Sequence, residues 1–175
     1  QMIVARDGIS GTNKRAYSLF WSSSTNTIRF YVWKSGNSTQ SVSSTSTVTD
    51  GNWHHVLAVN DGSDLKIYID GVLEGTTIGG GGTIQSGIID FYIGRRVGFV
   101  TTLQAFWDGN IDEVAVWNSD QSSNVATIYN SGSPSDLTSL SPVSWWRMGE
   151  EANHSGGTWT LTDQGSGGND GTSTS

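Results

Sequence analysis

The feature that most constrains the fold is a two-residue alternation of apolar and polar side chains, interrupted by Asp-Gly pairs. In the segment 65–69, three aliphatic residues alternate with Lys66 and Tyr68, and Asp70-Gly71 leads directly into Val72. Successive side chains of a β-strand point to opposite faces, and an Asp-Gly pair supplies the two positive φ angles of a type I′ turn. The segment therefore predicts an antiparallel hairpin.

The same alternation predicts further strands, separated by turn residues at intervals of about ten residues. The expected strands are 2–6, 17–21, 28–33, 53–59, 88–93, 109–117 and 144–148, with at best an edge strand within 35–49. Many short strands with regular turns are typical of a β-sandwich or barrel. The pattern therefore predicts an all-β body.

One helix is expected near the C-terminal third. Ser122 or Ser123 is predicted to cap its start, and Gly132 to end it. The residues that recur at helical spacing are Val125, Ile128 and Tyr129. A helix of about two turns is marginal alone, so we expect it to dock on a sheet.

Composition narrows the classes of partner. The 175 residues carry 16 Asp and Glu against 9 Lys and Arg, a net charge of −7. Nucleic acids and anionic membranes are bound by clustered basic residues, so neither is an expected partner. The absence of Cys excludes disulfides and thiolate metal sites. The length fits one domain with a sizeable core.

Three segments together resemble the laminin-G-like, concanavalin A-like jelly roll of bacterial and phage surface proteins. They are 50–62, which begins Asp-Gly-Asn-Trp-His-His-Val, then 65–73, and 106–117 followed by the helix end at 128–132. Their order and spacing match the family across residues 1–132. The resemblance implies an all-β, antiparallel two-sheet jelly-roll sandwich with one short helix.

The C-terminal part departs from the order of that family. After a Ser/Pro-rich spacer at 133–143, the strand 144–148 and the Gly-rich loop 163–171 resemble segments that normally begin such a domain. Residues 144–175 are therefore expected to complete the same or a neighbouring sandwich, or to open a next repeat. An unpaired strand carrying Trp145-Trp146 would expose two large rings, which favours completion. The arrangement resembles phage virion proteins.

Catalysis has to be considered because the family that the chain resembles includes glucanases. Retaining glycoside hydrolysis requires two carboxylates about 5 Å apart. The nearest candidates, Asp112 and Glu113, are neighbours on an expected strand and would point to opposite faces. His54 and His55 diverge in the same way, which disfavours a zinc site. We therefore expect structural roles for these residues and no enzyme.

Calcium and glycans are the two ligands with candidate residues. Oxygen ligands for calcium are expected in rim loops, at Asp61, Asp64, Asp108 and Asn110. A glycan or a partner protein is expected to contact exposed aromatic and arginine side chains, namely Arg29, Tyr31, Trp33, Arg95, Arg96 and Trp107. Asp-Gly at 61 and 108 is also an ordinary turn signal, so plain turns compete with calcium.

These observations favour a non-catalytic adhesion or structural module. As a virion decoration or fibre component, it would contact copies of itself, other virion or surface proteins, or host glycans, on a virion surface or outside a cell. The alternative is a calcium-assisted carbohydrate-binding module of a secreted bacterial protein, and a glycoside hydrolase is the third reading. The pairing of the displaced terminal strand tests the virion component, a glycan array tests the carbohydrate-binding module, and turnover of β-glucans tests the hydrolase.

Overall fold

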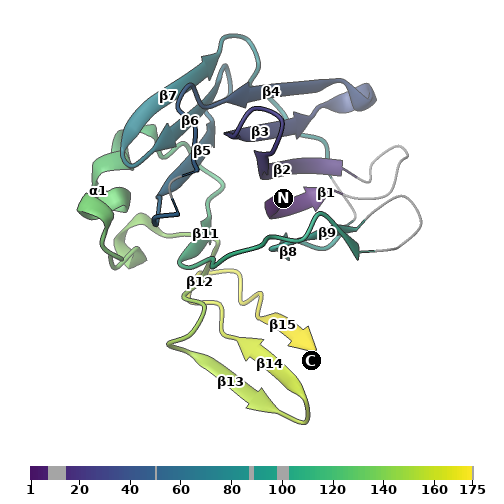
Figure 1. Ribbon diagram of the computed structural model, residues 1–175, viewed down its shortest axis with the longest axis vertical. Helices are drawn as coiled ribbons and strands as arrows, with labels where there is room; N and C mark the ends of the chain where they lie inside the picture. Colours follow the sequence, from purple (N-terminus) through teal and green to yellow (C-terminus); the bar gives the residue numbers. More distant parts are fainter. Residues whose placement is uncertain (8–14, 50, 87–88, 98–102, 175) are drawn as a thin grey trace.

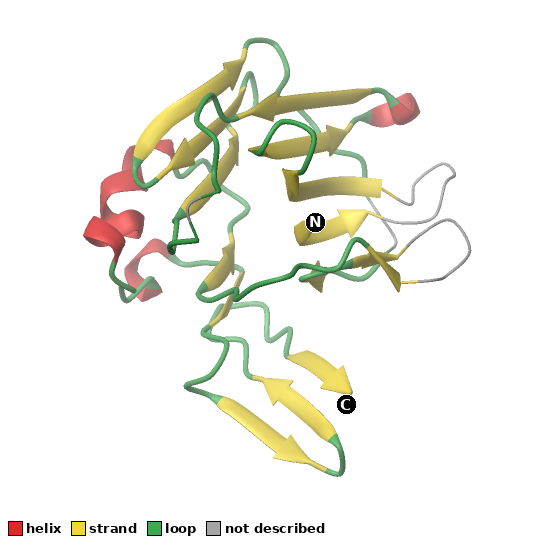
Figure 2. Cartoon of the chain, viewed as in Figure 1, coloured by secondary structure: helices red, strands yellow, loops and turns green. Residues whose placement is uncertain are grey.

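The computed structural model describes residues 1–7, 15–49, 51–86, 89–97 and 103–174, so Asp50 and Ile88 lie outside the described ranges. Antiparallel strands dominate, with one short helix at the side of the body and a separate sheet at the C-terminus (Figures 1 and 2). The predicted all-β class with a single short α-helix is confirmed. No helix in the described ranges is long and apolar enough to cross a membrane.

The first sheet has five strands, in the order β4-β3-β2-β1-β8. Their bounds are β1 Met2–Asp7, β2 Arg15–Ser22, β3 Thr27–Trp33, β4 Thr39–Ser43 and β8 Tyr92–Ile93. Leu19 pairs with Phe30, and Phe30 with Val42, so these three share the inner face. Ser18 pairs with Tyr31 on the opposite, outer face. The edge strand expected within 35–49 is β4.

The second sheet has the order β5-β6-β7, and it contains the predicted hairpin. Its strands are β5 Val56–Asn60, β6 Leu65–Ile69 and β7 Val72–Thr77. Ile69 pairs with Val72, and the two turn residues between them, Asp70 and Gly71, have φ angles of 50° and 79°. Both angles are positive, as a type I′ turn requires.

The turn also fixes the helix next to it, and this gives a first testable prediction. A Cβ on Gly71 would lie 2.7 Å from Cδ1 of Tyr129. We expect Gly71→Ala to lower the free energy of unfolding by about 2–3 kcal/mol, through the positive φ and the displaced ring together. Gly36→Ala is the matched control, because its φ of 77° is close to the 79° of Gly71 and nothing lies within 4 Å of the added Cβ. Urea unfolding of the two variants separates the cost of the positive φ from the cost of displacing the ring. Equal losses of unfolding free energy would contradict the contact with Tyr129.

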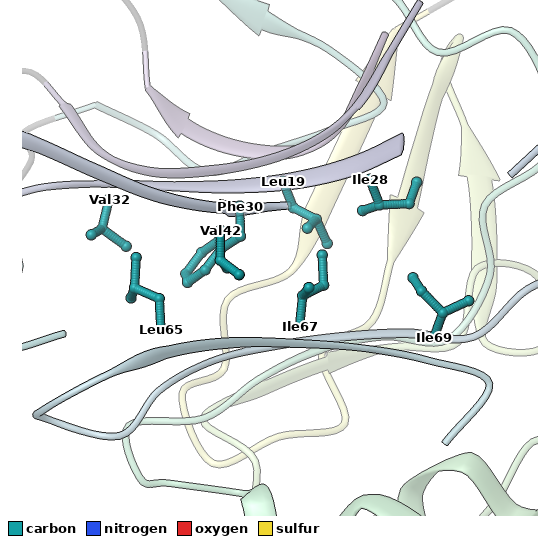
Figure 3. Packing of buried hydrophobic residues seen from close by; sticks show 8 residues of the cluster. All are labelled: Leu19, Ile28, Phe30, Val32, Val42, Leu65, Ile67 and Ile69. Atoms are coloured by element: carbon teal, nitrogen blue, oxygen red, sulfur yellow. The ribbon is translucent and has the colours of Figure 1, made fainter. Parts of the chain in front are cut away.

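The main core lies between the two sheets (Figure 3). Ile28 and Val32 of β3 face Leu65 and Ile67 of β6, and all four are at most 1% exposed. The other buried members of this cluster are Leu19, Phe30, Val42 and Ile69. Each sheet therefore contributes the inward half of its two-residue alternation, which is how a sandwich fills its interior.

A second cluster covers the opposite face of the second sheet. Leu57, Val59 and Tyr68 contact Val125 and Ile128 of α1 (Val125–Tyr129), and Leu137 and Trp145 complete the cluster. The helix docks on the sheet as predicted. Single 3₁₀ turns occupy Ser35–Asn37, Ser122–Asn124, Asn130–Gly132 and Thr138–Leu140.

The predicted cap of the helix is wrong. Neither Ser122 nor Ser123 provides a side-chain cap, and the backbone N–H of Ser122 instead donates to Oδ1 of Asp120 at 2.8 Å. The α-helix itself is only five residues long, because Asn130 turns into the left-handed region with a φ of 44°. An Asp that starts a turn two residues upstream offers the same acceptor as a serine cap.

Two predicted strands are much shorter than expected. Of 88–93 the structure retains β8 Tyr92–Ile93, and of 109–117 it retains β11 Val114–Val116. Glu113, with a φ angle of 51°, turns the chain out of the extended conformation directly before β11. The remaining short strands of the body are β9 Arg96–Val97, β10 Leu103–Gln104 and β12 Ser144–Trp146.

The C-terminal part pairs within its own chain. β12 lies antiparallel to β11, with Ala115 opposite Trp145, and Trp145 and Trp146 are only 4% and 5% exposed. Beyond it, a three-stranded sheet projects from the body (Figure 1). It consists of β13 Ala152–Ser155, β14 Thr158–Leu161 and β15 Gly171–Thr174. The buried carboxylate of Asp163 joins this sheet to the body by accepting the N–H of Trp145 at 2.7 Å.

Candidate functional site

A row of three aromatic rings lies on the outer face of the first sheet. Phe20 on β2 has its ring centroid 5.5 Å from that of Tyr31 on β3, and the ring of Trp33 follows at 6.0 Å. Strand alternation brings these rings together, because Phe20 and Tyr31 flank the inward-facing Leu19 and Phe30. The outer face thus carries three adjacent aromatic rings.

Arginine side chains stack on two rings of this aromatic row, the central one and one end. Cζ of Arg29 lies 5.1 Å from the ring centroid of Tyr31, and Cζ of Arg15 lies 5.5 Å from that of Trp33. A guanidinium above an aromatic face is attracted by the negative potential of the ring. These contacts hold the arginines flat against the sheet instead of extending into solvent.

A buried carboxylate fixes two of the arginines at one end of the row. Asp7 is 1% exposed and forms ion pairs with Nε of Arg15 at 3.2 Å and with Nη1 of Arg96 at 3.5 Å. Two guanidinium groups share one carboxylate, so this end of the outer face carries a net positive charge. The whole chain, in contrast, has a net charge of −7.

These groups line a groove of about 360 Å³. Its lining residues are Gln1, Met2, Asp7, Arg15, Ser18, Phe20, Tyr31, Trp33, Arg96 and Ala105. The backbone fixes one wall, because the N–H of Met2 donates to the carbonyl of Ala105 at 2.8 Å. An aromatic floor with a few fixed polar groups is typical of a small-ligand site.

The sequence was also compared with known proteins. A family model described as the concanavalin A-like lectin/glucanases superfamily matches residues 1–128. The chain belongs to the concanavalin A-like lectin/glucanase superfamily. The antiparallel sheets and the single short helix described above are consistent with the sandwich of this superfamily. Searches of curated proteins and of solved structures gave no match.

In this concanavalin A-like chain, the predicted ligand-binding residues divide into two groups. Tyr31, Trp33 and Arg96 line the groove, and Arg29 borders it through the ring of Tyr31. Arg95 stacks on Tyr92 at 5.2 Å, and Trp107 donates its Nε1–H to the carbonyl of Asn110, so neither lines the groove.

The expectation of an exposed tryptophan platform is wrong for Trp33. Its side chain is 7% exposed, because Arg15 and Tyr31 cover it, whereas Tyr31 itself is partly exposed. Most of the other lining residues were missed, and the argument for a site depends on three of them, Asp7, Arg15 and Phe20. Phe20 was accessible to sequence reasoning, because it alternates with Leu19 and so must face outward. Asp7 and Arg96 are far apart in the sequence, so no local sequence pattern indicates that they pair.

At the first pair of residues expected to bind calcium, Asp61 and Asp64, the carboxylate of Asp61 already has partners within the chain. Oδ1 of Asp61 accepts the N–H groups of Ser63 and Asp64, and its Oδ2 binds Nζ of Lys66 at 2.6 Å. Backbone hydrogen bonds from Asp64, with Lys66, lower the pKa of Asp61 to about 2. The ammonium group of Lys66 thus occupies the position beside Oδ2 of Asp61 that a bound cation would take.

The second candidate pair for calcium, Asp108 and Asn110, lies in the loop around Trp107. The carbonyl of Asn110 accepts the indole N–H of Trp107 at 3.2 Å. Within the described residues, no three His, Asp or Glu side chains lie close enough together to hold a metal ion. A calcium site at these positions would therefore need ligands other than a carboxylate cluster.

The acidic and histidine pairs serve structural purposes. Glu113 accepts the indole N–H of Trp145 at 2.7 Å and binds Nε of Arg147 at 3.1 Å, which fixes β11 against β12. Nδ1 of His54 lies 2.7 Å from Oδ2 of Asp70. Burial lowers the pKa of His55, against the opposing charge of Asp70, so its imidazole stays neutral. Among the described residues that line the groove, Asp7 is the single carboxylate.

Proposed function

We propose that the chain is a non-catalytic binding module that holds a saccharide in the groove on the outer face of its first sheet. The observation that carries this proposal is the partly exposed ring of Tyr31 between Phe20 and Trp33, in a groove that the guanidinium groups of Arg15 and Arg96 also line. Apolar ring faces accept the C–H face of a sugar, and fixed polar groups orient its hydroxyls. Membership of a lectin and glucanase superfamily supports a carbohydrate ligand.

The small number of carboxylates in the groove supports binding without hydrolysis. Glycosidases place two carboxyl groups on either side of the scissile bond, and one of them carries a proton. Asp7 is buried and ion-paired with Arg15 and Arg96, and it has no acidic partner among the described lining residues. Turnover of β-glucans that disappears in Glu113→Gln would contradict this part of the proposal.

The proposal predicts that binding depends on the central ring of the row. On an array of neutral and acidic oligosaccharides, the wild-type chain is expected to bind with calcium and equally with a chelator. Tyr31→Ala is expected to weaken the binding of the best array ligand about ten-fold or more, a loss of about 1.4 kcal/mol or more measured by calorimetry.

Trp53→Ala is the matched control for this experiment. Trp53 is 66% exposed and lies outside the groove, so its removal deletes an aromatic ring without touching the proposed site. Equal losses in both variants, or an array with no bound glycan in either arm, would overturn the proposal. Thermal unfolding of each variant confirms that the fold is intact.

Exposed apolar side chains favour a second candidate function, contact with sister subunits or with other virion or surface proteins. Trp53, Phe106 and Trp159 are 66%, 57% and 46% exposed, and each offers a large apolar side chain that a partner protein could cover. Placement on a virion or outside a cell belongs to the same proposal. Light scattering tests it, and a monomer at every concentration would remove the sister-subunit form.

A further inference from the structure

A slot lies between β5 of the second sheet and β11, away from the saccharide groove. Its volume is about 560 Å³, and it opens into the core between the sheets. One side is formed by the inner face of the first sheet, with Val4, Leu19 and Phe30, and the other by Ile128 and Leu137. A group in this slot would therefore contact apolar side chains on two sides.

The edge of β5 that borders the slot has free backbone groups. The N–H of Asp70 donates to the carbonyl of His55, and that of Asp61 to Asp64, which fixes the alternation of the β5–β6 ladder. In that alternation, Leu57 and Val59 exchange hydrogen bonds with β6, while the N–H and C=O groups of Val56 and Ala58 point away from it. Within the described residues, no strand pairs with this edge.

The edge of β11 that borders the slot is likewise not paired with any strand of the described ranges. Trp145, which lies opposite Ala115, has its N–H bonded to Asp163 and its C=O to the N–H of Gln164. Trp145 and Ala115 are thus a non-hydrogen-bonded pair, and the N–H and C=O of Ala115 point away from β12. Figure 1 shows β11 on the side of β5 away from β6. The slot thus has a free strand edge on either side.

We propose that this slot accepts an extended strand from another polypeptide, a run of about five apolar residues flanked by basic residues. The strand would bond through its backbone to Val56 and Ala58 on one side and to Ala115 on the other, as in β-strand addition. Its side chains would be apolar on both faces, because a strand covered on both sides reads as a continuous apolar run.

The charge of the lining favours basic flanks on this strand. The ionisable lining groups include Asp61, Glu113 and Asp120, and none of the described lining residues is a lysine or an arginine. Lys66 and Arg147 bind the first two from outside the lining, while Asp120 carries no such ion pair in the described part of the chain. The net charge of −7 adds a long-range attraction for a basic segment.

The proposal is tested with a synthetic peptide of five alternating valine and alanine residues between two lysines at each end. Amide hydrogen exchange is measured on the full chain with and without the peptide. The amides of Val56, Ala58 and Ala115 are expected to exchange fast in the free protein and about ten-fold or more slowly when peptide is bound. The amides of Leu57 and Val59 are the internal control, because β6 protects them in both states.

Two modified peptides and one variant separate backbone pairing from apolar adsorption. N-methylation of alternate peptide residues removes donors and keeps the side chains, and it is expected to weaken binding about ten-fold or more. Glutamates in place of the lysines are expected to weaken it as well. Ala58→Pro removes one outward N–H from β5 without breaking a bond to β6, which an edge strand tolerates, and should also weaken binding.

Four results of the exchange and peptide-binding measurements would overturn the proposal. They are slow exchange of Val56, Ala58 and Ala115 in the free protein, no protection by the peptide, equal binding of the N-methylated peptide, and equal binding of the glutamate-flanked peptide. Protection of the same amides that rises with protein concentration without peptide would assign the slot to a second copy and would overturn it too. Loss of folding in Ala58→Pro leaves the exchange measurement on the wild-type chain as the deciding one.

Discussion

Ile67→Ala is expected to lower the free energy of unfolding by about 4 kcal/mol, because it opens a cavity that the two sheets cannot close. Ile67 is 0% exposed and lies between the sheets, facing the first sheet from the central strand of the second (Figure 3). Both neighbouring strands are paired with β6, so the backbone has little freedom to collapse into the vacated space. Urea unfolding at neutral pH measures the loss.

The matched control for this substitution is Ile78→Ala. Ile78 is 86% exposed, so the same change of side chain removes almost no contact and should alter the free energy of unfolding by less than about 0.5 kcal/mol. A loss below about 1 kcal/mol for Ile67→Ala would mean that the layers repack freely, and would contradict the close-packed interior described above.

Asp163→Ala is expected to cost about 3 kcal/mol of unfolding free energy. Asp163 is 8% exposed, and its carboxylate accepts backbone N–H groups of Trp145, Gly165 and Asn169 at 2.7–2.8 Å. Removing the acceptor leaves these donors without a partner next to β12, and each buried unpaired group costs about 1–3 kcal/mol. Asp136→Ala is the control, because its carboxylate serves an exposed turn at Thr138.

The same residue gives a prediction of pH dependence. Burial raises the pKa of Asp163, but the hydrogen bonds from Trp145, Asn169 and Gly165 outweigh it and hold the pKa below its ordinary value. The unfolded chain therefore binds the proton first, with a pKa of about 3.9, and the stabilisation is present above that pH and lost as the pH falls.

Asp163→Asn isolates this contribution. The wild-type chain should lose more unfolding free energy between pH 5 and pH 2 than the variant does, since the variant has no proton to take up at this position. Denaturant unfolding at several pH values measures both slopes. Identical slopes would show that Asp163 is protonated equally in the folded and unfolded chains, contrary to its hydrogen bonding.

The fold was largely predictable because its signals are local. The alternation at 65–69 and the turn at Asp70-Gly71 determine the second sheet, and the apolar spacing of Val125 and Ile128 determines the helix face. Where prediction failed, one backbone angle decided the outcome. Glu113 adopts a left-handed φ of 51° and ends a strand that side-chain alternation alone would extend back to residue 109.

The candidate site was only partly predictable, because the groove depends on contacts between distant segments. Tyr31 and Arg29 follow from the alternation of one strand. The burial of Trp33 depends on Arg15, and that of Asp7 on Arg96, eighty-nine residues along the chain. Strand register and loop closure bring these residues together, and a single sequence carries no local mark of either.

The second sheet is covered on both faces, by the first sheet on one side and by α1 with its neighbouring residues on the other. It is therefore the central layer of the molecule, and substitutions in β6 can disturb the packing of either adjoining layer. Change is tolerated mainly on the outermost surfaces, where the aromatic row lies. Under the proposed function, substitutions in the aromatic row can therefore change ligand preference without disturbing this scaffold.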